Sequence, residues 1–389
     1  MTKAPKATDL ASALIQCPSV TPEEAGVLDY LDGLLAPFGF EIHRPVFSEA
    51  GYPDVENMFA KLSGGEGPHL AFAGHVDVVP AGDEALWSAP PFSGTIKDGL
   101  LYGRGAADMK GGVAAFVAAV LRYIEKHGAP KGTISFILTG DEEGPACNGT
   151  VKLMQWAAER GEQFSDSVLG EPTNPHAMGD MIKVGRRGSQ SGTVRVCGKQ
   201  GHVAYPHLAN NPVPVLAKIV EHVSAQTLDE GTEFFQPSNL EFISFDVGNP
   251  AWNVIPEQAA ARFNVRFNDL WDAEKLKAFV SDHARQCLPE EGFSLSVTLE
   301  ADGSEAFLTR SQALIDRFSD AVSTVTGKTP ELSTGGGTSD ARFIKNYCPV
   351  IEFGLVGQTM HMVDEHVAVA DIEQLTDIYY AFMQDYFDQ

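Results

Sequence analysis

The sequence predicts an α/β protein with an α/β/α domain around a mostly parallel sheet, interrupted by an inserted α+β domain of ferredoxin-like type. Apolar strands alternate with helical patterns up to about residue 187. A β-α-β-β-α-β order then occupies about 188–300, and helical spacing returns near Phe307. A chain of 389 residues is long enough for two separate cores.

The first part of the chain alternates between helical and β-like patterns. Thr8 and Thr21 are candidate N-caps of its first two helices. The apolar runs are short enough for buried strands, which favours a parallel sheet covered on both faces. The predicted elements are helices over 8–16, 23–36 and 111–126, and strands over 40–47, 57–62, 69–76, 133–139 and 168–169.

The pattern changes near Gly185-Arg186-Arg187-Gly188. The elements predicted beyond it are strands over 191–197, 239–247, 259–267 and 293–299, with helices over 211–225 and 272–287. A further buried strand is expected at 349–353. We therefore predict a discontinuous first domain, 1–187 and 301–389, and an inserted domain at 188–300.

Composition limits the partners and the compartment. Lys and Arg number 28 against 52 Asp and Glu, a formal charge of −24, which disfavours nucleic acid and anionic membranes. An anionic substrate would need a local cationic pocket. Five scattered cysteines without a CxxC pair indicate reduced thiols. The first residues lack the apolar core of a signal peptide and no apolar run is long enough to span a bilayer, so we expect a cytoplasmic protein.

Metal-ligand residue types recur where predicted strands end. His75, Glu142-Glu143 and Glu171 each follow such a strand, and open α/β sheets bind ligands at that edge. Asp108 in GRGAADMKGG and His361 in TMHMVDE complete the set. Two histidines and three carboxylates could hold two divalent cations, with Glu142 left to carry protons. This inventory indicates a metallohydrolase that attacks an amide bond with activated water.

Each assignment has a physical reason. His75 and Asp77 lie on one face of an extended segment, so Asp77 can orient the imidazole. Asp108 can bridge two cations through its two oxygens. Adjacent side chains diverge, so Glu143 is assigned to metal and Glu142 to proton transfer. Each assignment also has an alternative. His75 and Asp77 could form an ordinary hydrogen bond at a strand end, and Asp108 could be a helix N-cap. Glu142-Glu143 could belong to a solvated acidic loop.

The charge balance supports two cations. Asp108, Glu143 and Glu171 contribute a charge of −3 against the +4 of two divalent cations. A bridging hydroxide would neutralise the remaining +1. Without cations these carboxylates would raise each other's pKa values. Histidine and carboxylate ligands without thiolate favour zinc, with cobalt or manganese as substitutes.

Other motifs suggest substrate recognition. His202, in KQGHVAYPHLANNP, could donate to an oxyanion or could be a surface-loop histidine. The basic run Lys183, Arg186 and Arg187 could bind carboxylates or form a solvated hinge, with Arg266 and Arg342 as further candidates. Residues 334–340 could form an anion-binding nest or a structural turn. A rival interpretation takes Gly103-Arg104-Gly105 as part of a dinucleotide loop, hence an NAD-dependent oxidoreductase, although the third glycine is missing.

Together these motifs resemble the M20 family of metallopeptidases and amidohydrolases over nearly the whole chain. The matching segments are GHVDVVPAG, YGRGAADMKGG, GDEEG, GEPT, VGRRGS, GHVAYPH, NVIP, GGGTSDARF and TMHMVDE. The resemblance implies one metal on His75, Asp108 and Glu171. It implies the other on Asp108, Glu143 and His361, with Glu142 as general base and acid and Asp77 as the residue that orients His75.

The same resemblance implies a homodimer formed through the inserted domain and a small N-acyl amino-acid substrate. His202 and Asn253 would reach across the dimer. The implied substrate contacts are Arg186, Ser189, Tyr205, Arg266, Thr334 and Gly336. One departure is Gly357, where some members carry an asparagine four residues before the last histidine ligand. A metal-free binding protein that retains the fold is the alternative from another class.

Overall fold

The computed structural model describes residues 3–301 and 303–388. The described residues form two compact units. The first contains the chain up to Val184, Thr309–Ser333 and the part from Ser339 onward. The second contains Gly185–Leu308 and Thr334–Thr338. Each unit is described separately below.

The first unit is built on an eight-stranded sheet whose four central strands run parallel. Parallel strands buried on both faces need continuous apolar side chains, and all seven residues of β5 are buried. The predicted mostly parallel sheet is confirmed. In spatial order its strands are β1 (Glu41–His43), β4 (Met58–Ser63), β8 (Thr133–Thr139), β5 (His69–His75), β9 (Asp166–Leu169), β20 (Val350–Glu352), β10 (Met181–Lys183) and β19 (Glu331–Ser333).

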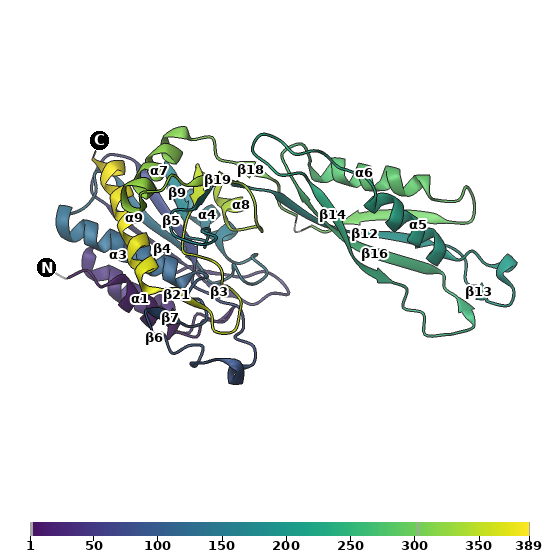
Figure 1. The fold of residues 1–389 in the computed structure, drawn as a ribbon, viewed down its shortest axis with the longest axis horizontal. Helices are drawn as coiled ribbons and strands as arrows, with labels where there is room; N and C mark the ends of the chain where they lie inside the picture. The colour runs from purple at the N-terminus through teal and green to yellow at the C-terminus, as the bar shows by residue number, and fades with distance from the viewer. Residues whose placement is uncertain (1–2, 302, 389) are drawn as a thin grey trace. The chain divides into compact units, whose positions relative to one another are not determined.

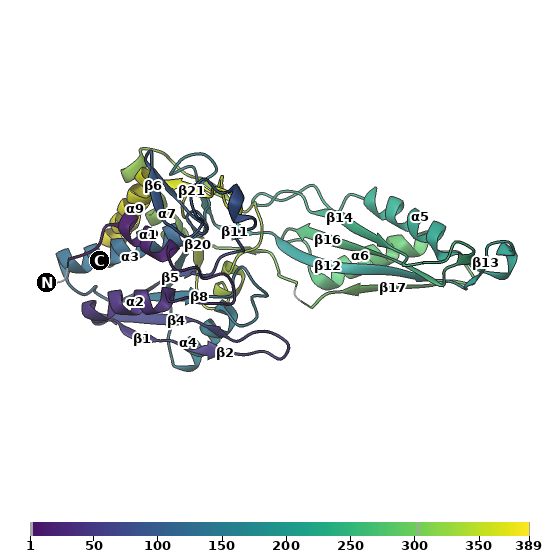
Figure 2. The ribbon, with the colours of Figure 1, turned by 90° about the horizontal axis from the view of Figure 1, so that it is seen from below.

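Helices cover both faces of this sheet (Figures 1 and 2), with α3 and α9 on one side of β5 and α4 on the other. Phe72 of β5 stacks on Phe116 of α3 with ring centroids 3.9 Å apart, and Tyr379 of α9 closes the cluster. Full burial of each such ring contributes about 1.5–3 kcal/mol. The helices are α1 (Ala7–Ile15), α2 (Val27–Leu35), η1 (Ala36–Phe38), η2 (Glu84–Leu86), α3 (Lys110–His127), α4 (Thr150–Glu159), α7 (Gln312–Thr326), α8 (Ala341–Ile344) and α9 (Val369–Phe387).

The two predicted N-caps are wrong. Helix α1 begins at Ala7, so Thr8 lies inside its first turn, where its hydroxyl donates to Glu373 of α9 at 2.7 Å. Helix α2 begins only at Val27, because the residues before it form turns. The carboxylate of Glu24 accepts from the amide of Leu28 at 3.1 Å, which supplies a capping bond that Thr21 does not make.

Short strands connect these elements, in a two-stranded and a three-stranded sheet. They are β2 (Val46–Phe47), β3 (Val55–Glu56), β6 (Thr95–Lys97), β7 (Leu100–Tyr102) and β21 (His366–Ala368). Strand β7, which precedes Gly103, belongs to the small sheet rather than to the parallel one. The dinucleotide-loop interpretation is therefore wrong, because that loop must follow a strand of a βαβ unit.

The second unit has the predicted ferredoxin-like topology. Its sheet order is β14-β16-β12-β17, every pair is antiparallel, and one helix follows the first strand and one the third. Buried and more exposed residues alternate along β12, so one face packs against the helices. The elements are β12 (Gly188–Cys197), α5 (Pro212–Ser224), β14 (Asn239–Asp246), β16 (Gln258–Phe267), α6 (Ala273–Gln286) and β17 (Ser294–Leu299), with the short pieces β11 (Gly185–Arg186), β13 (Gly201–His202), η3 (Pro206–Leu208), β15 (Val254–Ile255) and β18 (Phe307–Leu308).

No helix among the residues described here combines the length and the hydrophobicity that crossing a membrane requires.

Candidate metal centre

The carboxyl ends of three adjacent parallel strands place most of the candidate ligands. His75 is the last residue of β5, Glu142-Glu143 follow β8, and Glu171 follows β9. Because β8, β5 and β9 are neighbours, their carboxyl ends share one edge of the sheet. Two loops bring in the rest: Asp108 just precedes α3, and His361 lies between β20 and β21.

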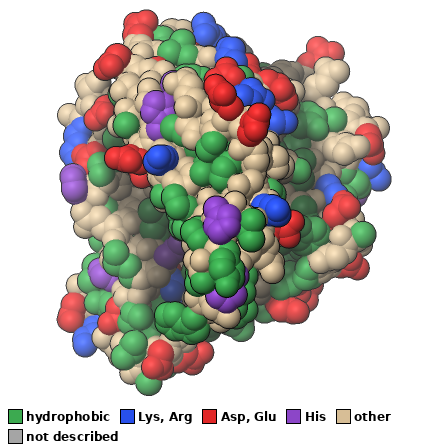
Figure 3. Space-filling view, turned by 90° about the vertical axis from the view of Figure 1, so that its right-hand side faces the viewer, with side chains coloured by type: hydrophobic (Ala, Val, Ile, Leu, Met, Phe, Trp, Pro, Cys, Tyr) green, Lys and Arg blue, Asp and Glu red, His purple; other side chains and the backbone are tan. Residues whose placement is uncertain are grey.

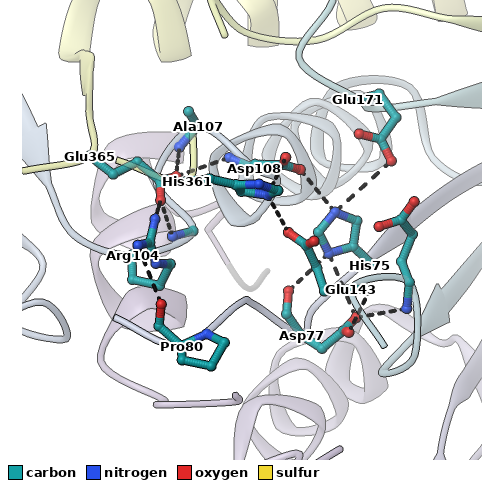
Figure 4. A network of polar contacts seen from close by, with 12 residues as sticks. His75, Asp77, Pro80, Arg104, Ala107, Asp108, Glu143, Glu171, His361 and Glu365 are labelled. Atoms are coloured by element: carbon teal, nitrogen blue, oxygen red, sulfur yellow. Dashed lines mark hydrogen bonds and ion pairs between the residues drawn. The ribbon is translucent and has the colours of Figure 1, made fainter. Parts of the chain in front are cut away.

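The five predicted ligands meet in one cluster (Figure 4). His75 Nε2 lies 3.0 Å from Asp108 Oδ1 and 3.9 Å from Glu171 Oε1. His361 Nε2 lies 2.9 Å from Glu143 Oε1 and 3.4 Å from Asp108 Oδ2. The two oxygens of Asp108 thus face two different histidines, as a carboxylate that bridges two cations requires.

Asp77 orients His75 in a different way from the one expected. The Nδ1–H of His75 donates to the backbone carbonyl of Asp77 at 2.9 Å, whereas the Asp77 carboxylate is 3.6 Å away. That carboxylate instead accepts the amide N–H groups of Glu142 at 3.3 Å and Glu143 at 3.0 Å. The carbonyl therefore leaves the Nε2 lone pair of His75 available to a cation, and the carboxylate holds the Glu142-Glu143 turn.

Two acids of the cluster, Glu171 and Glu142, have raised pKa values, as expected where carboxylates gather without enough positive charge. Burial, together with Asp108 and Glu142, raises the pKa of Glu171 well above its usual value. Its Oε1 is buried without a hydrogen-bond partner among the described residues. Burial is the main cause that raises the pKa of Glu142 to about 8. The charges of Asp340 and Asp108 add to this rise, whereas the charge of His75 opposes it. Divalent cations would remove both penalties, so the donor set fits the metals that the sequence predicts.

The histidines respond in the opposite direction. Burial alone would lower the pKa of His75, but the hydrogen bond and charge of Asp108 raise it well above its usual value. Hydrogen bonds to Asp108 and Glu143 raise the pKa of His361 to about 10. Protons therefore occupy the histidine nitrogens when cations are missing, and we expect metal binding to release protons.

The raised pKa of Glu142 makes metal-free stability depend on pH. The folded pKa, about 8, lies above the ordinary value of 4.5, so the folded state holds this proton more tightly. The contribution is complete below pH 4.5 and is lost as pH rises to about 8. In thermal unfolding of the metal-free protein, we expect Glu142→Gln to reduce this loss by about 1–3 kcal/mol relative to wild type. Parallel pH profiles for the two proteins would contradict the assignment.

Two buried acids outside the predicted set of ligands and proton carrier lie beside the cluster. Asp340, within GGGTSDARF, is buried, and its charge adds to the raised pKa of Glu142. Glu365, four residues after His361, is fully buried. The sequence does not show that an acidic residue is buried. The one signal for a role of these two acids was their position inside the motifs GGGTSDARF and TMHMVDE.

The substrate contacts that the family resemblance implies all lie in the second unit, in three groups, whereas Lys183 and Arg342 lie in the first unit. Arg186 Nη1 donates to Gly337 O at 3.1 Å. Gly336 has φ +101°, a backbone conformation that favours glycine, and a Cβ there would lie 2.7 Å from the flexible end of Arg186. The hydroxyl of Thr334 donates to the Phe234 carbonyl at 2.5 Å. Arg186 of β11 thus contacts the loop that carries Thr334 and Gly336.

Ser189 of β12 and Arg266 of β16 are cross-strand partners. Burial and the nearby charge of Arg187 lower the pKa of Arg266. Arg187 itself donates to Pro237 O and Asn239 Oδ1, and Lys183 of β10 donates to Ser333 at 3.2 Å. These bonds indicate structural roles for Arg187 and Lys183, the alternative left open for part of the basic run.

His202, Tyr205 and Asn253 form the third group. The Val203 amide donates to Asn253 O at 3.1 Å, and the rings of His202 and Tyr205 are 5.7 Å apart. The Ala204 amide donates to His202 Nδ1 at 3.0 Å. That bond places the ring proton on Nε2, so His202 is an exposed hydrogen-bond donor.

Comparisons with known proteins agree with this architecture. The sequence profile of the peptidase family M20/M25/M40 matches residues 71–385. A tripeptidase of Staphylococcus aureus is similar over 100% of both chains, with 20% identity and a TM-score of 0.78. A metallo-carboxypeptidase of Sulfolobus solfataricus matches 99% of this chain and 100% of its own, with 16% identity and a TM-score of 0.77. A dinuclear metal-binding peptidase of Bacillus subtilis matches 98% of each chain, with 14% identity and a TM-score of 0.73.

Proposed function

The chain belongs to the peptidase family M20/M25/M40, and we propose that it is a di-metal amidohydrolase that cleaves N-succinyl-LL-2,6-diaminopimelate to succinate and LL-2,6-diaminopimelate. The observation that carries the hydrolytic chemistry is Asp108 with one oxygen towards His75 and the other towards His361. The substrate rests on VGRRGS and GGGTSDARF, which resemble the segments of succinyl-diaminopimelate desuccinylases of the bacterial lysine and diaminopimelate pathway.

We propose His75, Asp108 and Glu171 as ligands of one cation and Asp108, Glu143 and His361 as ligands of the other. Zinc suits this donor set, and cobalt or manganese could replace it. Bound there, the cations would polarise the scissile carbonyl and acidify water. The remaining steps fall to side chains of the protein.

Glu142 is the proposed proton carrier. Its carboxylate comes within 4.8 Å of ligand atoms of His75 and Glu143, whereas Glu143 also lies that close to Asp108 and His361. The amide of Glu142 is held by Asp77, which fixes the turn from which the carboxylate projects. Glu142 would take a proton from the attacking water and return it to the leaving amine.

His202 is the proposed donor to the oxyanion, through the Nε2 proton that the Ala204 amide selects. We propose that it acts in a homodimer together with Asn253, across the interface between two copies. Hydrophobic side chains and histidines gather on the end of the second unit that carries β13 (Figure 3). Val203, Tyr205 and Leu208 are exposed beside that strand, and such apolar surface is typical of a protein interface.

The succinylated substrate carries several carboxylates, although the protein has a charge of −24. Cationic side chains close to the site must therefore hold the substrate. Arg186 and Arg266 would bind carboxylates, since a planar guanidinium can bond both oxygens. Ser189, Tyr205, Thr334 and the backbone at Gly336 would supply neutral contacts. A cytoplasmic location is consistent with such a biosynthetic substrate and with reduced cysteines.

A second candidate is another M20 deacylase, acting for example on acetylornithine, or a dipeptidase. Gly357 stands where some members carry an asparagine, so a substrate contact is missing at that position or is supplied by another residue. The similar tripeptidase from Staphylococcus aureus shows that peptide hydrolysis occurs on this fold.

Substrate preference separates the candidates. We expect kcat/KM for N-succinyl-LL-diaminopimelate to exceed that for N-acetylornithine and for a dipeptide by about 10²-fold or more, because unpaired guanidinium groups penalise the smaller acyl group. The measurement is initial-rate kinetics with zinc-loaded enzyme. Arg266→Met should reduce the preference, whereas exposed Arg285→Met on α6 should leave it unchanged. Equal or higher kcat/KM on acetylornithine would support the second candidate instead.

A further inference from the structure

Glu365 is a buried carboxylate that does not belong to the ligand cluster. Its side chain is 0% exposed. Oε1 accepts the amides of Ala107 at 2.8 Å and Asp108 at 3.2 Å. Oε2 accepts the amide of Gly105 at 3.0 Å and Nη1 of Arg104 at 2.6 Å. Figure 4 shows the Glu365 carboxylate directed at this loop, beside His361 and Asp108.

Further bonds tie the same two segments together. The amide of Gly103 donates to the backbone carbonyl of Glu365 at 2.9 Å. The next residue, His366, pairs with Tyr102 where β21 meets β7. The loop of residues 103–108, which carries Asp108, is therefore joined to the loop that carries His361.

The charge of Glu365 is balanced locally. Arg104, 2% exposed, forms the ion pair with it. The Arg104 guanidinium lies 5.3 Å from the centre of the Trp87 ring, and its Nη2 donates to Pro80 O at 3.4 Å. Both oxygens of Glu365 are thus committed to N–H groups, which leaves the carboxylate unsuited to bind a cation itself.

We infer that Glu365 is a positioning residue for the metal centre, which holds the Asp108 loop against the His361 loop so that one oxygen of Asp108 faces each histidine. This inference rests on the proposed two-metal function. Three backbone amides of an irregular buried loop would lose their acceptor without it, and a buried N–H group without an acceptor is destabilising. The backbone of Asp108 is itself one of the three, so a shift there moves the bridging carboxylate.

The test is zinc and cobalt binding to the metal-free Glu365→Gln variant, followed by calorimetry and by the visible spectrum of the cobalt form. The amide has nearly the same shape, but its NH2 group would face N–H donors. We expect zinc affinity to fall about 10–100-fold, the size typical for partners that orient ligands. The site that contains His361 should weaken more, because His361 lies on the displaced loop, and the cobalt spectrum should change.

Two further variants complete the experiment. Glu365→Asp keeps the charge on a shorter side chain and should restore part of the affinity. Asp364→Asn removes the same charge from the neighbouring, partly exposed residue, whose carboxylate accepts from the amide and the hydroxyl of Ser88, and should bind zinc like wild type.

Wild-type zinc affinity and an unchanged cobalt spectrum in Glu365→Gln would overturn the inference. If Glu365→Gln does not fold, the same measurements on Glu365→Asp decide. Wild-type zinc affinity in Glu365→Asp would then contradict the inference. Failure of the wild-type protein to bind two cations would instead contradict the proposed function, so the two failures can be told apart.

Discussion

Replacing Glu142 by glutamine is expected to lower kcat about 10²–10⁴-fold while the protein still binds two zinc ions per subunit. The variant keeps the size of the side chain and loses only its ability to take up and return a proton. Its neighbour Glu143, which contacts His361 at 2.9 Å, is unaltered, so the proposed ligands remain. The measurements are steady-state turnover of the succinylated substrate and metal content of the same preparation.

A matched control separates this effect from a general loss of negative charge. Glu159, an exposed glutamate at the end of α4, can be changed to glutamine in the same way and should leave kcat and zinc content unchanged. A Glu142→Gln enzyme with near-normal kcat would exclude Glu142 as the proton carrier. Loss of zinc together with turnover would indicate that Glu142 is a ligand instead.

The elements that position the metal centre were predictable because their hydrophobic patterns are strong. The apolar run at 69–76 is β5, the alanine-rich segment at 111–126 is most of α3, and 133–139 is β8 with the same bounds. Parallel strands bring their carboxyl ends to one edge, so the meeting of His75, Glu143 and Glu171 follows from topology. The alternation of strands and helices was enough to predict a mostly parallel sheet.

The parts that failed depend on contacts made across the fold. Thr8 has the residue type of an N-cap, but Glu373, far away in sequence, takes its hydroxyl. The Asp77 carboxylate was expected on His75, but two amides of the β8 turn compete for it and the carbonyl replaces it. The buried amides that Glu365 satisfies have no sequence signature, because their partner follows some 260 residues later.

The most direct test of the account is a titration of metal-free protein with zinc, in wild type and in Asp108→Asn. An amide has a single oxygen acceptor, so asparagine could not take the bridging role that we propose for the Asp108 carboxylate, whose Oδ1 faces His75 and whose Oδ2 faces His361. Asp98→Asn is the control, since Asp98 is an exposed turn residue with positive φ, which asparagine tolerates.

We predict two zinc ions per subunit for wild type and for Asp98→Asn, with turnover that appears as zinc is added. For Asp108→Asn we predict at most one zinc ion and a fall in kcat of about 10³-fold or more. A wild-type protein that hydrolyses its substrate without zinc or any other divalent cation, or an Asp108→Asn variant that binds two ions and keeps full turnover, would contradict the account.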